Sequence, residues 1–81
     1  MENTEPKYNN ISLNDIIDNN FVYHAPKEDQ PKRYELIRNT IKNAAKIISE
    51  NCPSSRELSI AINKLDEAVM WANASIARNE K

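Results

Sequence analysis

Few side chains in this sequence are suited to covalent chemistry. His24 and Cys52 are the only histidine and the only cysteine among 81 residues, so one copy has no internal disulfide and no cluster of Cys and His metal ligands. Counting alone allows a Ser/His/Asp arrangement, but no nucleophile elbow or glycine-built oxyanion loop supports it, because glycine is absent. Asp66 and Glu67 are adjacent and would point about 100 degrees apart on a helix, too far to share a proton. We therefore expect no enzymatic activity, no cofactor and no metal.

A second group of side chains suits binding rather than catalysis. Arg38, Lys42 and Lys46 are spaced four residues apart and would project on one side of a helix. Such a row is most often a solvated face. Arg38, however, lies toward the helix end that meets the aromatic segment 21–24, which includes Tyr23. An aromatic plane beside an arginine suits a nucleobase and a phosphate.

The elements that position these residues are predicted to be helices. Residues 1–11 are expected to be a disordered tail and residues 12–81 a single all-α domain. Ser12 suits the capping position of a short helix over 13–19. A long helix should begin near 29–31, where proline is tolerated in the first turn.

The long helix is predicted to end at 51–53, and a second long helix follows at once. Ser54 with Glu57 three residues later forms a capping box before an apolar run. Cys52 extends the first apolar face and is expected to be buried. Each helix has one apolar face: Tyr34, Ile37, Ile41, Ala44, Ala45 and Ile48 in the first, and Leu58, Ala61, Ile62, Leu65, Ala68, Val69, Ala72 and Ile76 in the second. The short connection makes the helices antiparallel neighbours, a helical hairpin.

The second long helix has a further apolar surface. Ile60 and Trp71 are eleven residues apart, close to three turns, and Met70 lies near them. A helix that is apolar on two sides needs two packing partners, and a chain of this size buries little core alone. We expect these three residues to lie in an interface between copies. The alternative is that Trp71 lies under the aliphatic stems of Lys64 or Glu67.

Composition limits the partners. The formal net charge is −1, which argues against general polynucleotide binding through Arg38, Lys42 and Lys46. The first ten residues are polar and resemble no signal peptide, and no apolar segment approaches the length of a membrane span. We expect a soluble protein with no membrane partner, and the single thiol fits a reducing cytosol.

Two segments together resemble a known family. The first is FVYHAP at 21–26 followed by RYELIR at 33–38. The second is CPSSRE at 52–57, continuing through KLDEAVMWANASIARN at 64–79. Their combination is similar to a family of small tailed-phage proteins, the second described class of anti-CBASS proteins, which are cyclic-oligonucleotide sponges. The resemblance covers residues 21–79 and leaves the N-terminal segment outside.

The resemblance implies a function in the cytoplasm of an infected bacterium. The host answers infection with a cyclic di- or trinucleotide signal, of the cGAMP or cyclic tri-adenylate type, which activates a cell-killing CBASS effector. A phage protein of this family binds the signal without cleaving it and so keeps the effector off. The family is helical and hexameric, with one kind of pocket between two chains for dinucleotides and another among three chains for trinucleotides.

The resemblance also assigns residues to the two pockets. In the two-chain pocket, Tyr23 is expected to stack on a base and Arg38 to contact phosphate. His24, next to Tyr23, is expected to be a structural residue or a ligand contact rather than a general base. The three-chain pocket is expected to use residues at the start of the second long helix: Arg56, Ser59 and Asn63. Asn63 stands where the family is expected to have threonine.

One alternative uses the same helices differently. A helical protein–protein module, such as a phage inhibitor of a host protein, would place the surface of Ile60 and Trp71 against a foreign partner. The solution mass of the purified protein distinguishes the two, because the alternative predicts a monomer.

Overall fold

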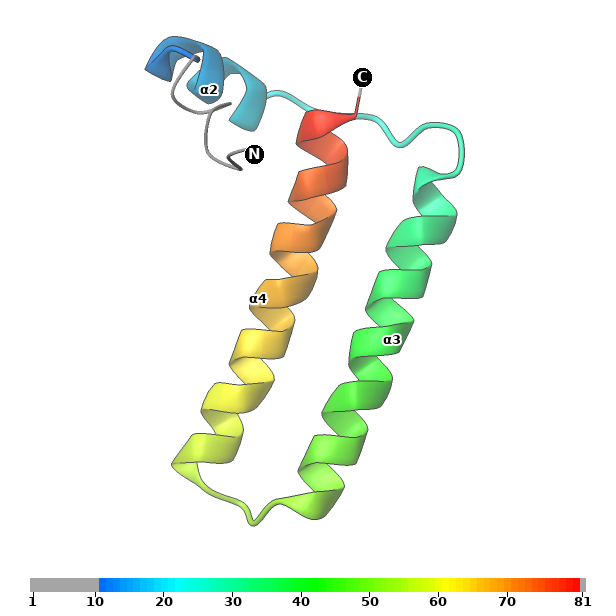
Figure 1. Ribbon diagram of the computed structural model, residues 1–81, viewed down its shortest axis with the longest axis vertical. Helices are drawn as coiled ribbons and strands as arrows, with labels where there is room; N and C mark the ends of the chain where they lie inside the picture. The colour runs from blue at the N-terminus through cyan, green and yellow to red at the C-terminus, as the bar shows by residue number, and fades with distance from the viewer. Residues whose placement is uncertain (1–10, 81) are drawn as a thin grey trace, which may run out of the picture.

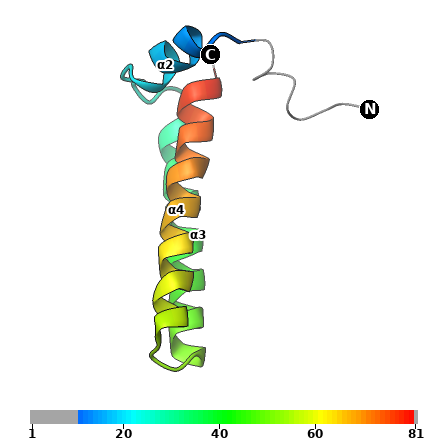
Figure 2. The same ribbon diagram turned by 90° about the vertical axis from the view of Figure 1, so that its left-hand side faces the viewer.

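A computed structural model describes residues 11–80 and contains three helices in that part of the chain, α2 (Leu13–Asn20), α3 (Gln30–Asn51) and α4 (Arg56–Asn79). The two long helices run side by side in opposite directions, and α2 lies beside the C-terminal end of α4, on the side away from α3 (Figures 1 and 2). No strand occurs within the described residues. The all-α class and the hairpin with a short N-terminal helix are therefore confirmed. The predicted tail falls outside the described residues except for Ile11.

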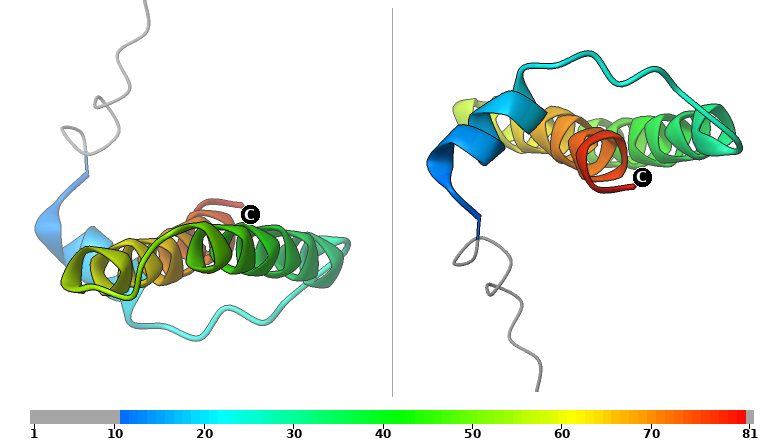
Figure 3. Two further views of the ribbon diagram at one scale, coloured as in Figure 1. Left: turned by 90° about the horizontal axis from the view of Figure 1, so that it is seen from below. Right: turned by 90° about the horizontal axis from the view of Figure 1, so that it is seen from above.

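The start of α2 follows the predicted capping pattern. The Ser12 hydroxyl accepts a hydrogen bond from the Asp15 backbone N–H at 3.1 Å, which satisfies one of the free donors at a helix N-terminus. The helix extends to Asn20, one residue beyond the predicted end. Between α2 and α3, residues 21–29 arch around the C-terminal end of α4 (Figure 3, right). This segment carries the predicted ligand residues of the two-chain pocket.

The start of α4 differs from the prediction by one residue, because the capping residue is Ser55 and not Ser54. The Ser55 Oγ accepts from the Leu58 N–H at 3.1 Å and donates to the Pro53 carbonyl oxygen at 3.1 Å. Its extended backbone, with φ −167° and ψ 168°, is typical of a capping residue. Both serines are suitable capping residues, and only Ser54 has a glutamate three residues later, but the hydrogen bonds show that Ser55 is the cap.

The two serines give a matched test of this register. Replacing Ser55 with alanine removes the cap and is expected to lower the free energy of unfolding by about 1 kcal/mol. Replacing Ser54 with alanine leaves both Ser55 hydrogen bonds in place and is expected to change it much less. Urea unfolding followed by circular dichroism, at one protein concentration, measures the difference. Equal losses in the two variants would contradict the assignment of the cap.

The predicted apolar faces meet between α3 and α4, yet none of their side chains is buried in one chain. The face residues are half-buried, except that Ala68 is exposed, and Gln30 is the one buried residue among those described, with 4% of its surface exposed. Two helices form a single layer, so each apolar stripe stays open on the side away from its partner.

Cys52 is exposed, and the prediction that it is buried is wrong, because it lies in the turn beyond the end of the packed stripe. None of the described helices combines the length and apolar character needed to cross a membrane.

Candidate functional site

The loop between α2 and α3 presents the two predicted ligand residues differently. Tyr23 is 82% exposed, whereas His24 is half-buried. The His24 Nε2–H donates to the Asn19 carbonyl oxygen at 2.8 Å, and Asn19 in turn donates from Nδ2 to the Arg78 carbonyl oxygen at 2.9 Å. These two hydrogen bonds connect the loop to the last turn of α2, and α2 to the last turn of α4. His24 therefore helps to hold the loop, and the phenol ring of Tyr23 stands free.

Tyr23 and His24 line a hollow of about 340 Å³ at the open end of the hairpin. Tyr34 of α3 and Asn73 and Arg78 of α4 line the same hollow. Arg78 is half-buried, and its guanidinium makes no hydrogen bond or ion pair with the residues the structure describes. A planar cation without a carboxylate partner, next to two phenol rings, is suited to a phosphate attached to an aromatic base.

Asn73 adds a polar group to the wall of this hollow. Its Oδ1 atom is shielded from solvent and has no hydrogen-bond partner within residues 11–80. A buried acceptor left unsatisfied costs about 1–3 kcal/mol, so such groups need an explanation beyond packing. The Nδ2 group of this amide remains as a donor for a base edge or for a neighbouring chain.

Arg38 lies in a different hollow, of about 350 Å³, in the groove between α3 and α4. Lys42 from the basic row and Asn63 and Asp66 of α4 line it too. The structure therefore brings together Arg38 and Asn63, which the sequence assigns to different pockets. It does not bring Arg38 to the Tyr23 hollow of the same chain, because Arg38 lies eight residues into α3, about 12 Å from its start at the helical rise.

Arg56 and Ser59 lie at the far end of the molecule. Both are exposed in the first turn of α4, beside the connection from α3 (Figure 1). The 24 residues of α4 span about 36 Å. Within one chain, Arg56 and Tyr23 are therefore too far apart to contact one small ligand.

The predicted interface residues lie on the outer surface of α4. Ile60 is 37% exposed, Met70 57% and Trp71 67%. This exposure of Trp71 shows that the stems of Lys64 and Glu67 do not cover it as the alternative requires. Trp71 and Met70 line a hollow of about 460 Å³ that reaches Arg78.

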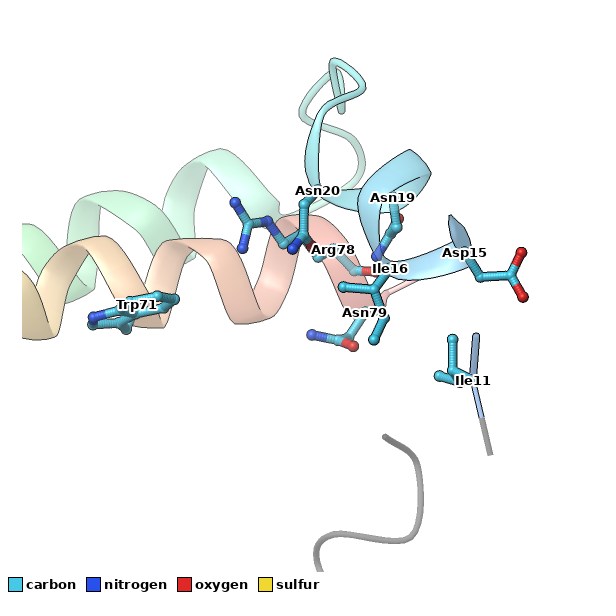
Figure 4. Close-up of a pocket in the computed structure, with 8 residues that line it drawn as sticks. All are labelled: Ile11, Asp15, Ile16, Asn19, Asn20, Trp71, Arg78 and Asn79. Atoms are coloured by element: carbon cyan, nitrogen blue, oxygen red, sulfur yellow. Dashed lines mark hydrogen bonds between the residues drawn. The ribbon is translucent and has the colours of Figure 1, made fainter. Parts of the chain in front are cut away.

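A further hollow, of about 420 Å³, lies between α2 and the C-terminal half of α4. Figure 4 shows three residues of α2, Ile16, Asn19 and Asn20, next to Arg78 and Asn79 at the end of α4. Trp71 lies farther back along α4. Arg78 thus lies between the Tyr23 loop and the Trp71 surface.

Glu80, just after α4, connects the end of α4 to the start of α3. Its carboxylate accepts from Arg33 Nη1 at 2.7 Å, from Arg33 Nη2 at 2.6 Å and from Gln30 Nε2 at 3.0 Å. The hydrogen bonds from Arg33 and then Gln30 lower the pKa of Glu80 from 4.5 to about 2, and the hydrogen bond to Glu80 raises the pKa of Arg33. Because the folded-state pKa of Glu80 is depressed, this contact stabilises the fold above about pH 4.5, and the contribution is lost as the pH falls through 2.

Sequence reasoning did not select Tyr34, Asn73, Arg78 or Glu80. Tyr34 was assigned to the hairpin face, where it is half-buried. Its place in the hollow with Tyr23 depends on the path of the loop, which the sequence pattern does not give. Asn73 and Arg78 stand inside the segment that carries the family resemblance. Asn73 is a polar residue between Ala72 and Ala74, a signal that would have identified it.

The comparison with protein families agrees with this arrangement. The family described as Acb2/Tad1, hairpin domain, matches residues 14–77. The match includes nearly all of α2, so the expectation that the first 20 residues lie outside the family is wrong for residues 14–20. Searches of curated proteins and of solved structures give no match. Because the matched segment spans most of the chain, the protein belongs to the Acb2/Tad1 hairpin-domain family, the anti-CBASS sponge family that its sequence resembles.

Proposed function

We propose that this protein binds cyclic di- and trinucleotide second messengers, of the cGAMP and cyclic tri-adenylate types, and sequesters them without cleavage. In an infected bacterial host it keeps the signal from the CBASS effector. The observation that carries the proposal is the hollow in which Tyr23 and Tyr34 lie near the unpaired guanidinium of Arg78. Membership of the Acb2/Tad1 hairpin-domain family supports it.

The chemistry of the hollow favours a nucleotide over a plain anion or a plain apolar ligand. Tyr23 is exposed and offers a ring face on which a base stacks, for about 1–3 kcal/mol per base. Arg78 offers a bidentate phosphate contact. Asn73 offers hydrogen bonds to a base edge. We assign Arg78 to the phosphate alongside Arg38, which would reach the ligand from a neighbouring copy.

Symmetry connects the ligand to the assembly. The hollow at the open end is shallow in one chain, and a cyclic dinucleotide is nearly two-fold symmetric. Two copies related by a two-fold axis would present Tyr23 and Arg78 once to each half of the ligand. The absence of any buried apolar side chain among the described residues favours such an assembly, because a lone hairpin leaves its stripe in water.

The trinucleotide site is proposed at the other end of the hairpin. Arg56, Ser59 and Asn63 occur at intervals of three and four residues, which places them along one side of α4. All three are exposed in one chain. A three-fold axis near this side would gather three arginines around three phosphates. Two-fold and three-fold axes together generate a hexamer of dihedral symmetry, which is the proposed assembly.

The groups at the hollow support sequestration rather than catalysis in this proposal. The Nε2 of His24 is engaged with the Asn19 carbonyl, and Cys52 lies in the turn at the opposite end of the hairpin. No group of three or more His, Cys, Asp or Glu side chains suited to a metal occurs between residues 11 and 80. The groups that line the hollow supply stacking, charge and hydrogen bonds, which suit binding.

Calorimetric titration with cyclic GMP–AMP and with cyclic tri-adenylate tests the proposal. We expect both to bind, one dinucleotide for every two chains and one trinucleotide for every three. Saturation with one ligand should leave the stoichiometry of the other unchanged. A protein that binds neither ligand contradicts the proposal.

The exposure of Met70 and Trp71 favours one other function, a helical module that inhibits a host protein. In that case the surface of these residues meets a foreign chain and the purified protein is a monomer. A light-scattering mass of one chain, together with no heat on titration of either nucleotide, would support this alternative.

A further inference from the structure

The segment 21–29, which carries Tyr23, contains no helix or strand. Hydrogen bonds fix this segment at its two ends. At the α2 end, His24 bonds the Asn19 carbonyl oxygen at 2.8 Å. At the α3 end, the Lys27 N–H donates to Gln30 Oε1 at 3.1 Å, and the Gln30 N–H donates to the Lys27 carbonyl oxygen at 2.9 Å. Whatever holds Gln30 therefore also holds the segment.

Gln30 is held by Glu80. Its side chain is 4% exposed, the least of any described residue, and its two amide atoms face different partners. Oε1 accepts from the segment at Lys27, and Nε2 donates to Glu80 Oε1 at 3.0 Å. The Glu80 carboxylate is itself fixed by the two-pronged contact with Arg33 at 2.6 and 2.7 Å. One carboxylate after α4 is thus connected through a buried amide to the backbone of the Tyr23 segment.

Glu80 and Tyr23 also border the same space. A hollow of about 250 Å³ is lined by both residues, together with His24, Lys27 and Gln30. Tyr23 also lines the hollow to which Arg78 contributes. The hydrogen bonds of Glu80 thus lie beside a hollow that Tyr23 also lines.

We infer that Glu80 is a positioning residue for ligand binding, which acts through Gln30 and Arg33 to hold the segment 21–29 against the end of α4. The ring of Tyr23 then stands beside Arg78 before the ligand arrives. An unattached segment would have to be ordered during binding, and each ordered residue costs conformational entropy. The inference rests on the proposed function for the identity of the ligand, and on the hydrogen bonds alone for the position of the segment.

The variant Glu80→Gln tests the inference. It keeps the size of the side chain and an oxygen for Gln30, but it removes the charge-assisted pair with Arg33. We expect affinity for cyclic GMP–AMP to fall about five- to tenfold and affinity for cyclic tri-adenylate to stay unchanged, because Arg56 lies at the opposite end of the hairpin. Glu50→Gln, an exposed carboxylate near that opposite end, is the matched control and should change neither.

Two further measurements separate positioning from a general loss of stability. In a Tyr23→Ala background, Glu80→Gln should weaken dinucleotide binding much less than it does alone, because the ring that it positions is gone. Without ligand, amide hydrogen exchange in residues 21–29 should be faster in Glu80→Gln than in the parent or in Glu50→Gln. The oligomer mass should be the same throughout.

The outcomes are distinct. Unchanged exchange in 21–29 with unchanged dinucleotide affinity overturns the inference, as does an equal loss for both ligands or full additivity with Tyr23→Ala. If the parent protein binds no cyclic dinucleotide, the proposed function fails, and the exchange measurement still decides whether Glu80 holds the segment.

Discussion

Replacing Trp71 with glutamate is expected to dissociate the protein into monomers. Trp71 is 67% exposed in the single chain and lies beside Met70, which is 57% exposed. If copies pack on this surface, the substitution places a charge in the contact without a partner. Burying an ion in that way costs on the order of several kcal/mol. Light scattering coupled to size exclusion should show the parental mass fall to that of one chain.

A matched variant keeps this experiment specific. Trp71→Phe retains an aromatic apolar side chain at the same position and is expected to keep the parental mass. Circular dichroism of Trp71→Glu should still show a helical chain if the loss is one of assembly. A Trp71→Glu variant with the parental mass would show that Trp71 lies outside the interface.

Tyr23→Ala and Arg56→Ala are expected to weaken different ligands. Tyr23→Ala removes stacking worth about 1–3 kcal/mol per base, and a symmetric two-chain pocket uses this ring twice, so the dinucleotide loss should exceed that of one contact. Arg56→Ala should weaken cyclic tri-adenylate and leave cyclic GMP–AMP nearly unchanged, because the two residues lie at opposite ends of the hairpin. Calorimetric titration of both ligands against both variants measures the pattern.

The arginine variants extend the same comparison. Arg78 lines the hollow with Tyr23, whereas Arg38 lines the groove with Asn63. Arg78→Ala should weaken dinucleotide binding, and Arg38→Ala should do so if a neighbouring copy carries Arg38 to the ligand. Each variant needs its oligomer mass checked. If Tyr23→Ala and Arg56→Ala weaken the same ligand equally in an intact oligomer, the two-pocket assignment is wrong.

The helices were predictable because their signals are local. The Pro31 start of α3, the Asn-Cys-Pro end and the apolar spacing of both long helices lie within a few residues of what they determine. The starting residue of α4 was not predictable, because the capping box with Glu57 selects Ser54, whereas the capping hydrogen bonds are made by the Ser55 hydroxyl. Cys52 was assigned to the apolar face by its spacing, which carries no information on where the packed stripe ends.

The site was predictable only in part, because much of it depends on contacts distant in sequence. The motif around Tyr23 and His24 identified the loop. The sequence contained no sign that Glu80 would meet Arg33, 47 residues earlier, or that Arg78 would share a hollow with Tyr23. Arg38 was placed near the aromatic segment from its position in the helix; within one chain, Arg78 lines the hollow with Tyr23 and Arg38 lines another.

Recovery of the bound nucleotide tests the central claim most directly. The protein is incubated with cyclic GMP–AMP, separated from free ligand by gel filtration and denatured, and the released nucleotide is analysed by chromatography. Tight binding without cleavage predicts that the nucleotide travels with the protein, near one for every two chains, and is released intact. Linear product formed in proportion to the amount of protein, or no nucleotide in the protein fraction, would contradict the account.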